Sequence, residues 1–171
     1  MDLFTNEQKR CLIESWRRDD FDWLYDVGIR VYSKIFELAP SAKQLFPYVV
    51  QYESEGRDFK ESKEFQNQAL RFVQALGKGV LSLEDENEKI EFDKYLHDLG
   101  RRHRKWESRG FIPEYWNIFE VAVTQIMSEE TSKAELEGRD KSGEKIEELY
   151  ALLANYIMLR MKEGFHDLTP E

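Results

Sequence analysis

The chain has 171 residues, enough for one domain with a substantial core and too few for two comfortable ones. Hydrophobic residues make up 41% and charged residues 35% of the sequence, and no apolar run approaches the roughly 20 residues that cross a membrane. The formal net charge of −9 argues against nonspecific nucleic-acid binding, because phosphate backbones attract basic surfaces. A membrane-spanning protein is therefore excluded, and a general nucleic-acid binder is disfavoured.

The beginning of the chain and its cysteine content bear on location and redox chemistry. The sequence MDLFTNEQKR contains no apolar signal core, and Asp2 stands where myristoylation requires a glycine, so we expect a cytoplasmic protein. Cys11 is the only cysteine and can form neither an internal disulfide nor a thiolate metal site. Its place beside Leu12 in an expected helix indicates a packing role.

Apolar residues recur at spacings of three and four throughout the chain, which predicts an all-α protein forming a single domain over 1–171. Thr5 and Gln8 form a predicted capping box, and Ser62 is a predicted helix cap. In chain order, helices are expected over 6–18, 21–38, 40–47, 62–82, 87–106, 113–128 and 141–163. Two segments are polar and are expected to be irregular: 48–60 and 129–145.

One histidine interrupts the polar, basic stretch DLGRRHRKW. His103 follows Phe92, Leu96 and Leu99 at helical spacing, so it continues an apolar stripe and points at the core. His97 shares its side of the helix with charged residues, which predicts a solvated position. A lone inward histidine is more often a hydrogen-bonded core residue than a ligand, and the stripe by itself leaves both interpretations open.

The second and fourth expected helices carry residues that break their apolar inner faces. Gln68 lies one turn before Phe72, where an unsatisfied buried amide would cost about 1–3 kcal/mol. Gly28 lies mid-helix, where glycine costs about 1 kcal/mol relative to alanine unless another backbone approaches closely. We expect Ala69 to make that approach, which brings Tyr32 near Gln68. An inward imidazole, amide and phenol with aromatic walls indicate a pocket for a flat group such as haem.

The sequence resembles the globins, most closely the neuroglobin and invertebrate branches, over roughly residues 5–165. The first-helix motif is ESW, and the second helix carries GIRVYSKIF. The segment LAPSAKQLFPY has the proline that globins place six residues before a haem-stacking phenylalanine. The last two motifs, SKEFQNQALRFV and YLHDLGRRHRKW, resemble the distal and proximal helices. Their order and spacing are difficult to obtain by chance.

The resemblance implies a globin fold of about seven to eight helices around a pocket for haem b. It makes His103 the proximal iron ligand and places Gln68 and Tyr32 on the distal side. The other cofactor contacts that it implies are Phe46, Phe72 and Trp116, with either Phe111 or Ile112 touching the haem. Neuroglobin-like proteins commonly carry a second histidine ligand where this chain has Gln68, so we expect five-coordinate ferrous iron.

The implied function is reversible dioxygen binding at ferrous iron, with Tyr32 and Gln68 donating hydrogen bonds, and no enzymatic role is expected. The alternative is a haem-based oxygen sensor, redox sensor or electron-transfer globin; nitric oxide dioxygenase or peroxidase-like activity ranks below these. Dioxygen and other diatomic gases are the expected ligands, and a homodimer or a regulatory protein partner is left open. The haem propionates are expected to meet one or more of four basic residues: Arg101, Arg102, Arg104 and Lys105.

Overall fold

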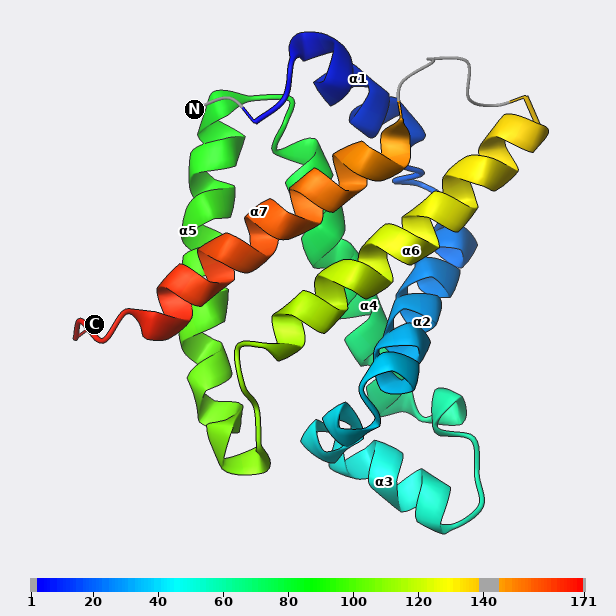
Figure 1. Cartoon of the computed structure of the whole chain (residues 1–171), viewed down its shortest axis with the longest axis vertical. Helices are drawn as coiled ribbons and strands as arrows, with labels where there is room; N and C mark the ends of the chain where they lie inside the picture. Colours follow the sequence, from blue (N-terminus) through cyan, green and yellow to red (C-terminus); the bar gives the residue numbers. More distant parts are fainter. Residues whose placement is uncertain (1–2, 139–144, 171) are drawn as a thin grey trace.

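The computed structural model describes residues 3–138 and 145–170, and every regular element in these ranges is a helix (Figure 1). In chain order the elements are α1 (Asn6–Ser15), α2 (Phe21–Leu38), η1 (Pro40–Leu45), α3 (Pro47–Ser54), η2 (Phe59–Glu61), α4 (Lys63–Leu81), α5 (Glu86–His103), η3 (Arg104–Arg109), α6 (Tyr115–Leu136) and α7 (Ile146–His166), where η denotes a 3-10 helix. The all-α prediction is confirmed. Within the described ranges, no helix has the length and apolar character needed to cross a membrane.

Side-chain caps begin the helices where the sequence predicts them. Thr5 Oγ1 accepts from Gln8 N at 3.2 Å, and Gln8 Oε1 accepts from Thr5 N at 3.0 Å, which completes the predicted capping box. Ser62 Oγ accepts from Phe65 N at 3.0 Å and caps α4. These bonds satisfy backbone donors that the first helical turn leaves unpaired. Cys11 is buried in α1, as expected of a packing residue.

The expectation of an irregular segment over 48–60 was wrong. The helix α3 begins at Pro47 and ends at Ser54, and the short η2 follows it. Proline suits the first helical position, because the N–H that it lacks would have no partner there. Pro47 therefore starts a helix rather than only ending one.

The expected irregular segment over 129–145 was also wrong in its first part, because α6 continues to Leu136. Buried Glu130 accepts from Trp23 Nε1 at 2.7 Å and from Arg30 Nη1 at 2.5 Å, so its charge is paired across to α2. Residues 139–144 lie outside the described residues. The last helix begins at Ile146 in the structure, against the expected 141.

Two pairs of helices cross with their backbones in contact. A Cβ added to Gly28 would lie 2.7 Å from the Ala69 carbonyl oxygen, which confirms the predicted close approach of α2 and α4. At the crossing of α5 and α7, a Cβ on Gly100 would lie 2.0 Å from the carbonyl oxygen of Met161. In the same way, a Cβ on Gly164 would lie 1.9 Å from the carbonyl oxygen of His97. Only glycine permits such approaches.

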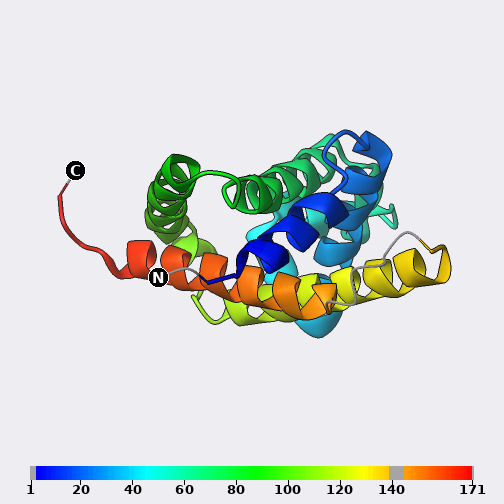
Figure 2. The same ribbon diagram turned by 90° about the horizontal axis from the view of Figure 1, so that it is seen from above.

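The helices form two layers that are seen most clearly from above (Figure 2). The helices α6 and α7 lie side by side in one layer, and α4 and α5 lie in the other. The helix α7 crosses α5, and α2 packs against both α4 and α6. The helix α6 therefore contacts α7 in its own layer and also contacts α2.

Candidate functional site

Two polar side chains from α2 and α4 meet in an otherwise aromatic environment. Gln68 Nε2 donates a hydrogen bond to Tyr32 Oη at 2.7 Å, as the expected proximity of these residues requires. Burial raises the pKa of Tyr32 to about 12, although the bond from Gln68 acts in the opposite direction. The phenol is therefore protonated at neutral pH. Because its oxygen accepts from the amide, its own hydrogen can be donated elsewhere.

Phenylalanine rings surround this polar pair. The ring centroid of Tyr32 lies 5.7 Å from that of Phe46 and 6.0 Å from that of Phe72, both in edge-on contacts. Phe72 also packs edge-on against Phe119 of α6 at 4.6 Å. The structure thus brings together Tyr32, Gln68, Phe46 and Phe72, which the sequence nominated, and adds Phe119, which sequence reasoning missed.

His103 is the last residue of α5 and lies in a cage of other rings. The centroid of its imidazole is 4.7 Å from Trp106, 5.4 Å from Phe111 and 5.3 Å from Trp116. Its Nδ1 atom lies 2.7 Å from the Leu99 carbonyl oxygen one turn earlier. A carbonyl can only accept, so Nδ1 carries the hydrogen. The lone pair is then left on Nε2, the ring atom through which this tautomer can bind a metal.

The charge state of His103 follows from its surroundings. Burial lowers the pKa of the imidazole to about 4, against the opposing effect of the Leu99 carbonyl. The positive charges of Arg102 and Lys105 lower the pKa further. The imidazole is consequently neutral at physiological pH, and the neutral form is the one that binds metals.

The first turn of α6 connects the two clusters. Trp116 packs against His103, and Phe119 packs against Tyr32 at 6.4 Å between centroids. Three helical residues correspond to a rise of about 4.5 Å, so the imidazole cage and the polar pair meet on the same helical turn. A neutral imidazole on one side, hydrogen-bond donors on the other and aromatic walls between them suit a flat, largely apolar group.

The segment between η3 and α6 completes the cage. Gly110 ends η3 with φ of +88°, a conformation that favours glycine. The chain then directs Phe111 inward, with 7% of its surface exposed, while 49% of Ile112 is exposed. Of the two alternatives left open by the sequence, Phe111 is therefore the residue that lines the site.

Two of the basic residues around His103 point to the C-terminal segment 167–170. Arg104 Nη1 donates to the Asp167 carbonyl oxygen at 2.8 Å, and Arg101 Nη2 donates to the Thr169 carbonyl oxygen at 2.7 Å. The Asp167 carboxylate lies 3.3 Å from Nε2 of His97, which is half-buried rather than fully solvated. Arg101 and Arg104 thus tie α5 to the C-terminal segment.

The remaining polar groups near the cages suit the charged edge of a cofactor. Tyr48 has a buried hydroxyl with no partner among the described residues, and its ring lies 6.0 Å from Phe46. Lys105 Nζ lies 4.5 Å from the centroid of Trp106, and Arg102 is exposed. A buried hydroxyl without a partner is costly, and an anionic group such as a propionate would satisfy it. The residues present therefore fit a haem.

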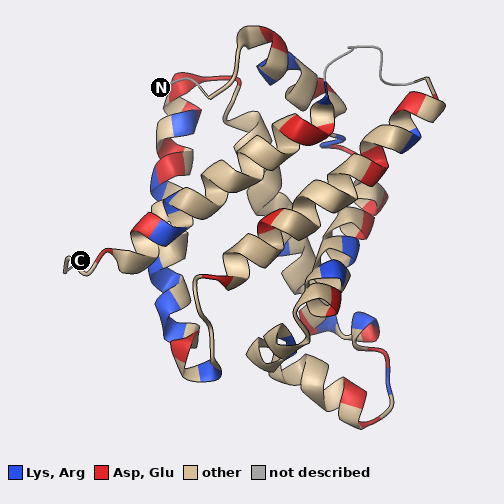
Figure 3. Ribbon diagram, in the orientation of Figure 1, with Lys and Arg blue, Asp and Glu red and all other residues tan. Residues whose placement is uncertain are grey.

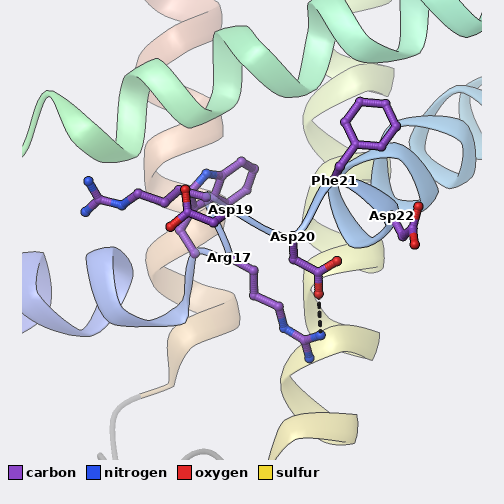
Figure 4. A pocket seen from close by; sticks show the side chains of 7 residues that line it. Arg17, Asp19, Asp20, Phe21 and Asp22 are labelled. Atoms are coloured by element: carbon purple, nitrogen blue, oxygen red, sulfur yellow. Dashed lines mark hydrogen bonds and ion pairs between the residues drawn. The ribbon is translucent and has the colours of Figure 1, made fainter.

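A hollow at another place on the surface offers a different set of groups. The hollow at the turn between α1 and α2 is lined by several carboxylates, and Arg17 pairs with Asp20 there at 3.5 Å (Figure 4). Asp20 also caps α2 by accepting from Trp23 N at 3.1 Å. Within the described ranges, no group of three or more His, Cys, Asp or Glu side chains is placed to hold a metal ion.

The sequence is similar to a known protein family and to curated proteins. The family model described as Globin matches residues 29–156. The globin-related protein glb-13 of Caenorhabditis elegans is 29% identical over 127 residues, which cover 74% of this chain and 43% of the worm protein. The matched region thus spans less than half of that relative. A Gossypium hirsutum protein named as an anaerobic nitrite reductase is 23% identical over 127 residues, 74% of each chain.

The fold has a close counterpart among solved structures. The crystal structure of a hexacoordinated heme protein from an anhydrobiotic tardigrade, determined at pH 4, superposes with a TM-score of 0.75. The two chains are 20% identical, and 96% of each is covered. The fold is therefore the one that surrounds a haem pocket with packed helices. Because the family model also spans most of the sequence, the chain belongs to the globin family.

Proposed function

We propose that this globin holds haem b through His103 and binds dioxygen reversibly at ferrous iron, with Tyr32 and Gln68 as hydrogen-bond donors. The observation that carries the proposal is the 2.7 Å bond from Gln68 Nε2 to Tyr32 Oη inside a ring of phenylalanines. A ferrous haem held by one imidazole offers its opposite face to a diatomic ligand. The side chains of Tyr32 and Gln68 and the phenylalanines around them then determine how slowly each ligand dissociates.

His103 contributes orientation as well as a lone pair. Its Nδ1–H is held by the Leu99 carbonyl, which fixes both the tautomer and the plane of the ring. A glutamine amide is a poor iron ligand compared with imidazole, so Gln68 leaves the distal position open. His97 faces Asp167 and His166 is exposed. We therefore propose five-coordinate ferrous iron, in contrast to the hexacoordination named for the tardigrade protein.

Tyr32 is the donor that the geometry favours most. The amide of Gln68 occupies the phenol oxygen and so directs the phenol hydrogen away from Gln68. Dioxygen on the distal side carries partial negative charge, and each hydrogen bond to it is worth about 0.5–1.5 kcal/mol. Carbon monoxide carries less charge on its outer atom. The pair is thus expected to retain dioxygen selectively.

Stopped-flow dissociation of dioxygen and carbon monoxide tests this role. Tyr32→Phe keeps the ring packing and removes the donor, so dioxygen should leave about tenfold faster, the factor that corresponds to about 1.4 kcal/mol. Carbon monoxide dissociation should change much less. Tyr150→Phe is the matched control, because Tyr150 is also buried but bonds to Ser15 at 3.0 Å, away from the site. Equal changes for both gases would contradict the proposal.

Nitrite reduction, the activity in the name of the Gossypium relative, is the competing function. It consumes electrons in every turnover, whereas reversible dioxygen binding consumes none. Repeated cycles of oxygenation and deoxygenation should therefore return the ferrous spectrum without an added reductant. A protein that is oxidised in each cycle, and that turns over nitrite when a reductant is supplied, would favour the redox function instead.

A further inference from the structure

The outer face of α6 and α7 differs in character from the rest of the molecule. Charged residues make up 35% of the chain. They are frequent along α5, whereas the outward sides of α6 and α7 are largely uncharged (Figure 3). Large apolar side chains are exposed at four positions of these helices: 53% of Val121, 90% of Leu136 at the end of α6, 45% of Leu152 and 50% of Leu159. A face of this kind, bordered by polar residues, is typical of a protein–protein contact.

The outward residues of α7 follow a regular pattern. Glu148, Leu152, Asn155, Leu159 and Lys162 are spaced by four, three, four and three residues, so they share one side of the helix. The pattern is symmetrical about Asn155. Leu152 and Leu159 lie on the two sides of the asparagine. Glu148 lies about 10 Å from Asn155 in one direction along the helix, and Lys162 lies about 10 Å from it in the other, so the two ends carry opposite charges.

We propose that this face binds a second copy of the chain about a twofold axis that passes near Asn155. When the two α7 helices pack antiparallel, Leu152 meets the partner's Leu159, and Glu148 meets the partner's Lys162. A twofold axis repeats every contact, so two leucine pairs and two ion pairs form at once. Each Asn155 meets its own copy, and an amide can both donate and accept.

The neighbouring helix supports and enlarges this surface. Asn155 Nδ2 donates to the Glu120 carboxylate at 3.2 Å, and Lys162 Nζ donates to Asn117 Oδ1 at 2.6 Å, so α6 holds both α7 side chains in place. Val121 adds apolar area on α6. Two adjacent helices of this length cover about 600 Å², which approaches the roughly 800 Å² per partner of a standard interface.

Sedimentation velocity over a concentration series tests the assembly. The wild type should form a dimer, and Leu159→Glu should shift it to monomer, because two carboxylates would be buried against the partner's Leu152. Ile90→Glu is the matched control: Ile90 is 58% exposed on α5, outside the proposed face, and its substitution should leave the dimer intact. Circular dichroism verifies that each variant is folded.

Charge reversal tests the pairing itself. Glu148→Lys or Lys162→Glu alone places like charges opposite each other twice and should raise the dimer dissociation constant by about tenfold. The double reversal restores opposite charges and should recover wild-type affinity. A wild type that stays monomeric, or a dimer that tolerates Leu159→Glu, overturns the proposal. A double variant as weak as the single ones also overturns it, because the antiparallel pairing would then be wrong.

Discussion

The distal and proximal sides of the candidate haem site are built on different principles. On the distal side, Tyr32 and Gln68 are joined by one hydrogen bond, and the rings around them supply only packing. On the proximal side, His103 ends a helix whose backbone is in direct contact with α7 at Gly100. In the proposed function, ligand selectivity would depend on a few side-chain atoms of Tyr32 and Gln68, whereas the position of His103 would depend on how whole helices pack.

Replacing His103, the proposed proximal ligand, should cause the largest change, a loss of bound haem. We expect His103→Ala to lose tight haem binding, because the Leu99 carbonyl holds Nδ1–H and leaves on Nε2 the lone pair that would bind the iron. His97→Ala and His166→Ala should keep normal haem, since His97 pairs with Asp167 and His166 is exposed. The Soret absorbance of each purified protein measures its haem content. Normal haem in His103→Ala would remove the basis of the site assignment.

Substitutions that disturb backbone packing should also lower the free energy of unfolding more on the proximal side than on the distal side. Gly100→Ala places a methyl group 2.0 Å from the Met161 carbonyl oxygen, and Gly28→Ala places one 2.7 Å from that of Ala69. We expect Gly100→Ala to lower the free energy of unfolding by about 3 kcal/mol or more, and Gly28→Ala by about 1–3 kcal/mol. Urea denaturation of the haem-free proteins measures both. The reverse order would show that the distal helices, not the proximal ones, are the less adaptable pair.

A smaller effect should come from the amide on the distal side. Gln68→Leu removes the bond that holds the phenol of Tyr32, so dioxygen should dissociate about three- to tenfold faster, in line with the loss of about 1 kcal/mol. Combining it with Tyr32→Phe should add less than the sum of the two single effects, because the residues act as a unit. Stopped-flow measurements give the comparison. Full additivity would mean that each donor acts independently.

The smallest expected effect concerns the C-terminal segment. Hydrogen bonds from the backbone and the hydroxyl of Thr169 lower the pKa of the Asp167 carboxyl. The nearby charges of Arg101 and His97 lower this pKa further. A lowered folded-state pKa stabilises the protein above the unfolded value of about 3.9, and this contribution disappears as the pH falls through the folded-state pKa.

Asp167→Asn removes this titration, so the stability difference between wild type and variant should shrink as the pH falls below about 4. Thermal unfolding from pH 7 to pH 3 measures that difference. Thr124→Val, on an unrelated helix face, serves as a control for the loss of one polar group. A difference that is constant with pH would assign Asp167 a role in packing alone.

Local patterns in the sequence were sufficient for most of the fold. The bounds of α2 are those that the apolar spacing predicted, and the caps at Thr5 and Ser62 are present. The Gly28 and Ala69 contact was also predictable, because a mid-helix glycine costs energy that close packing offsets. Each of these features depends on residues close together in sequence or on one simple steric rule.

The failures share a dependence on distant partners. The end of α6 reads as a charged loop because the sequence does not show that Glu130 pairs with Trp23 and Arg30. Phe119 of the site was missed for a similar reason: only the crossing of α6 with α2 and α4 brings its ring to Phe72. The orphaned hydroxyl of Tyr48 likewise becomes visible only when its surroundings are known.

The glycine contacts between α5 and α7 also have a mechanical consequence. Gly100 lies against the Met161 carbonyl, and Gly164 lies against the His97 carbonyl, so each backbone blocks the other from sliding along the helix axis. The two helices are therefore expected to move as a single rigid lever. Any displacement of His103 is then expected to move α7 as well, and with it the outer surface that α7 shares with α6.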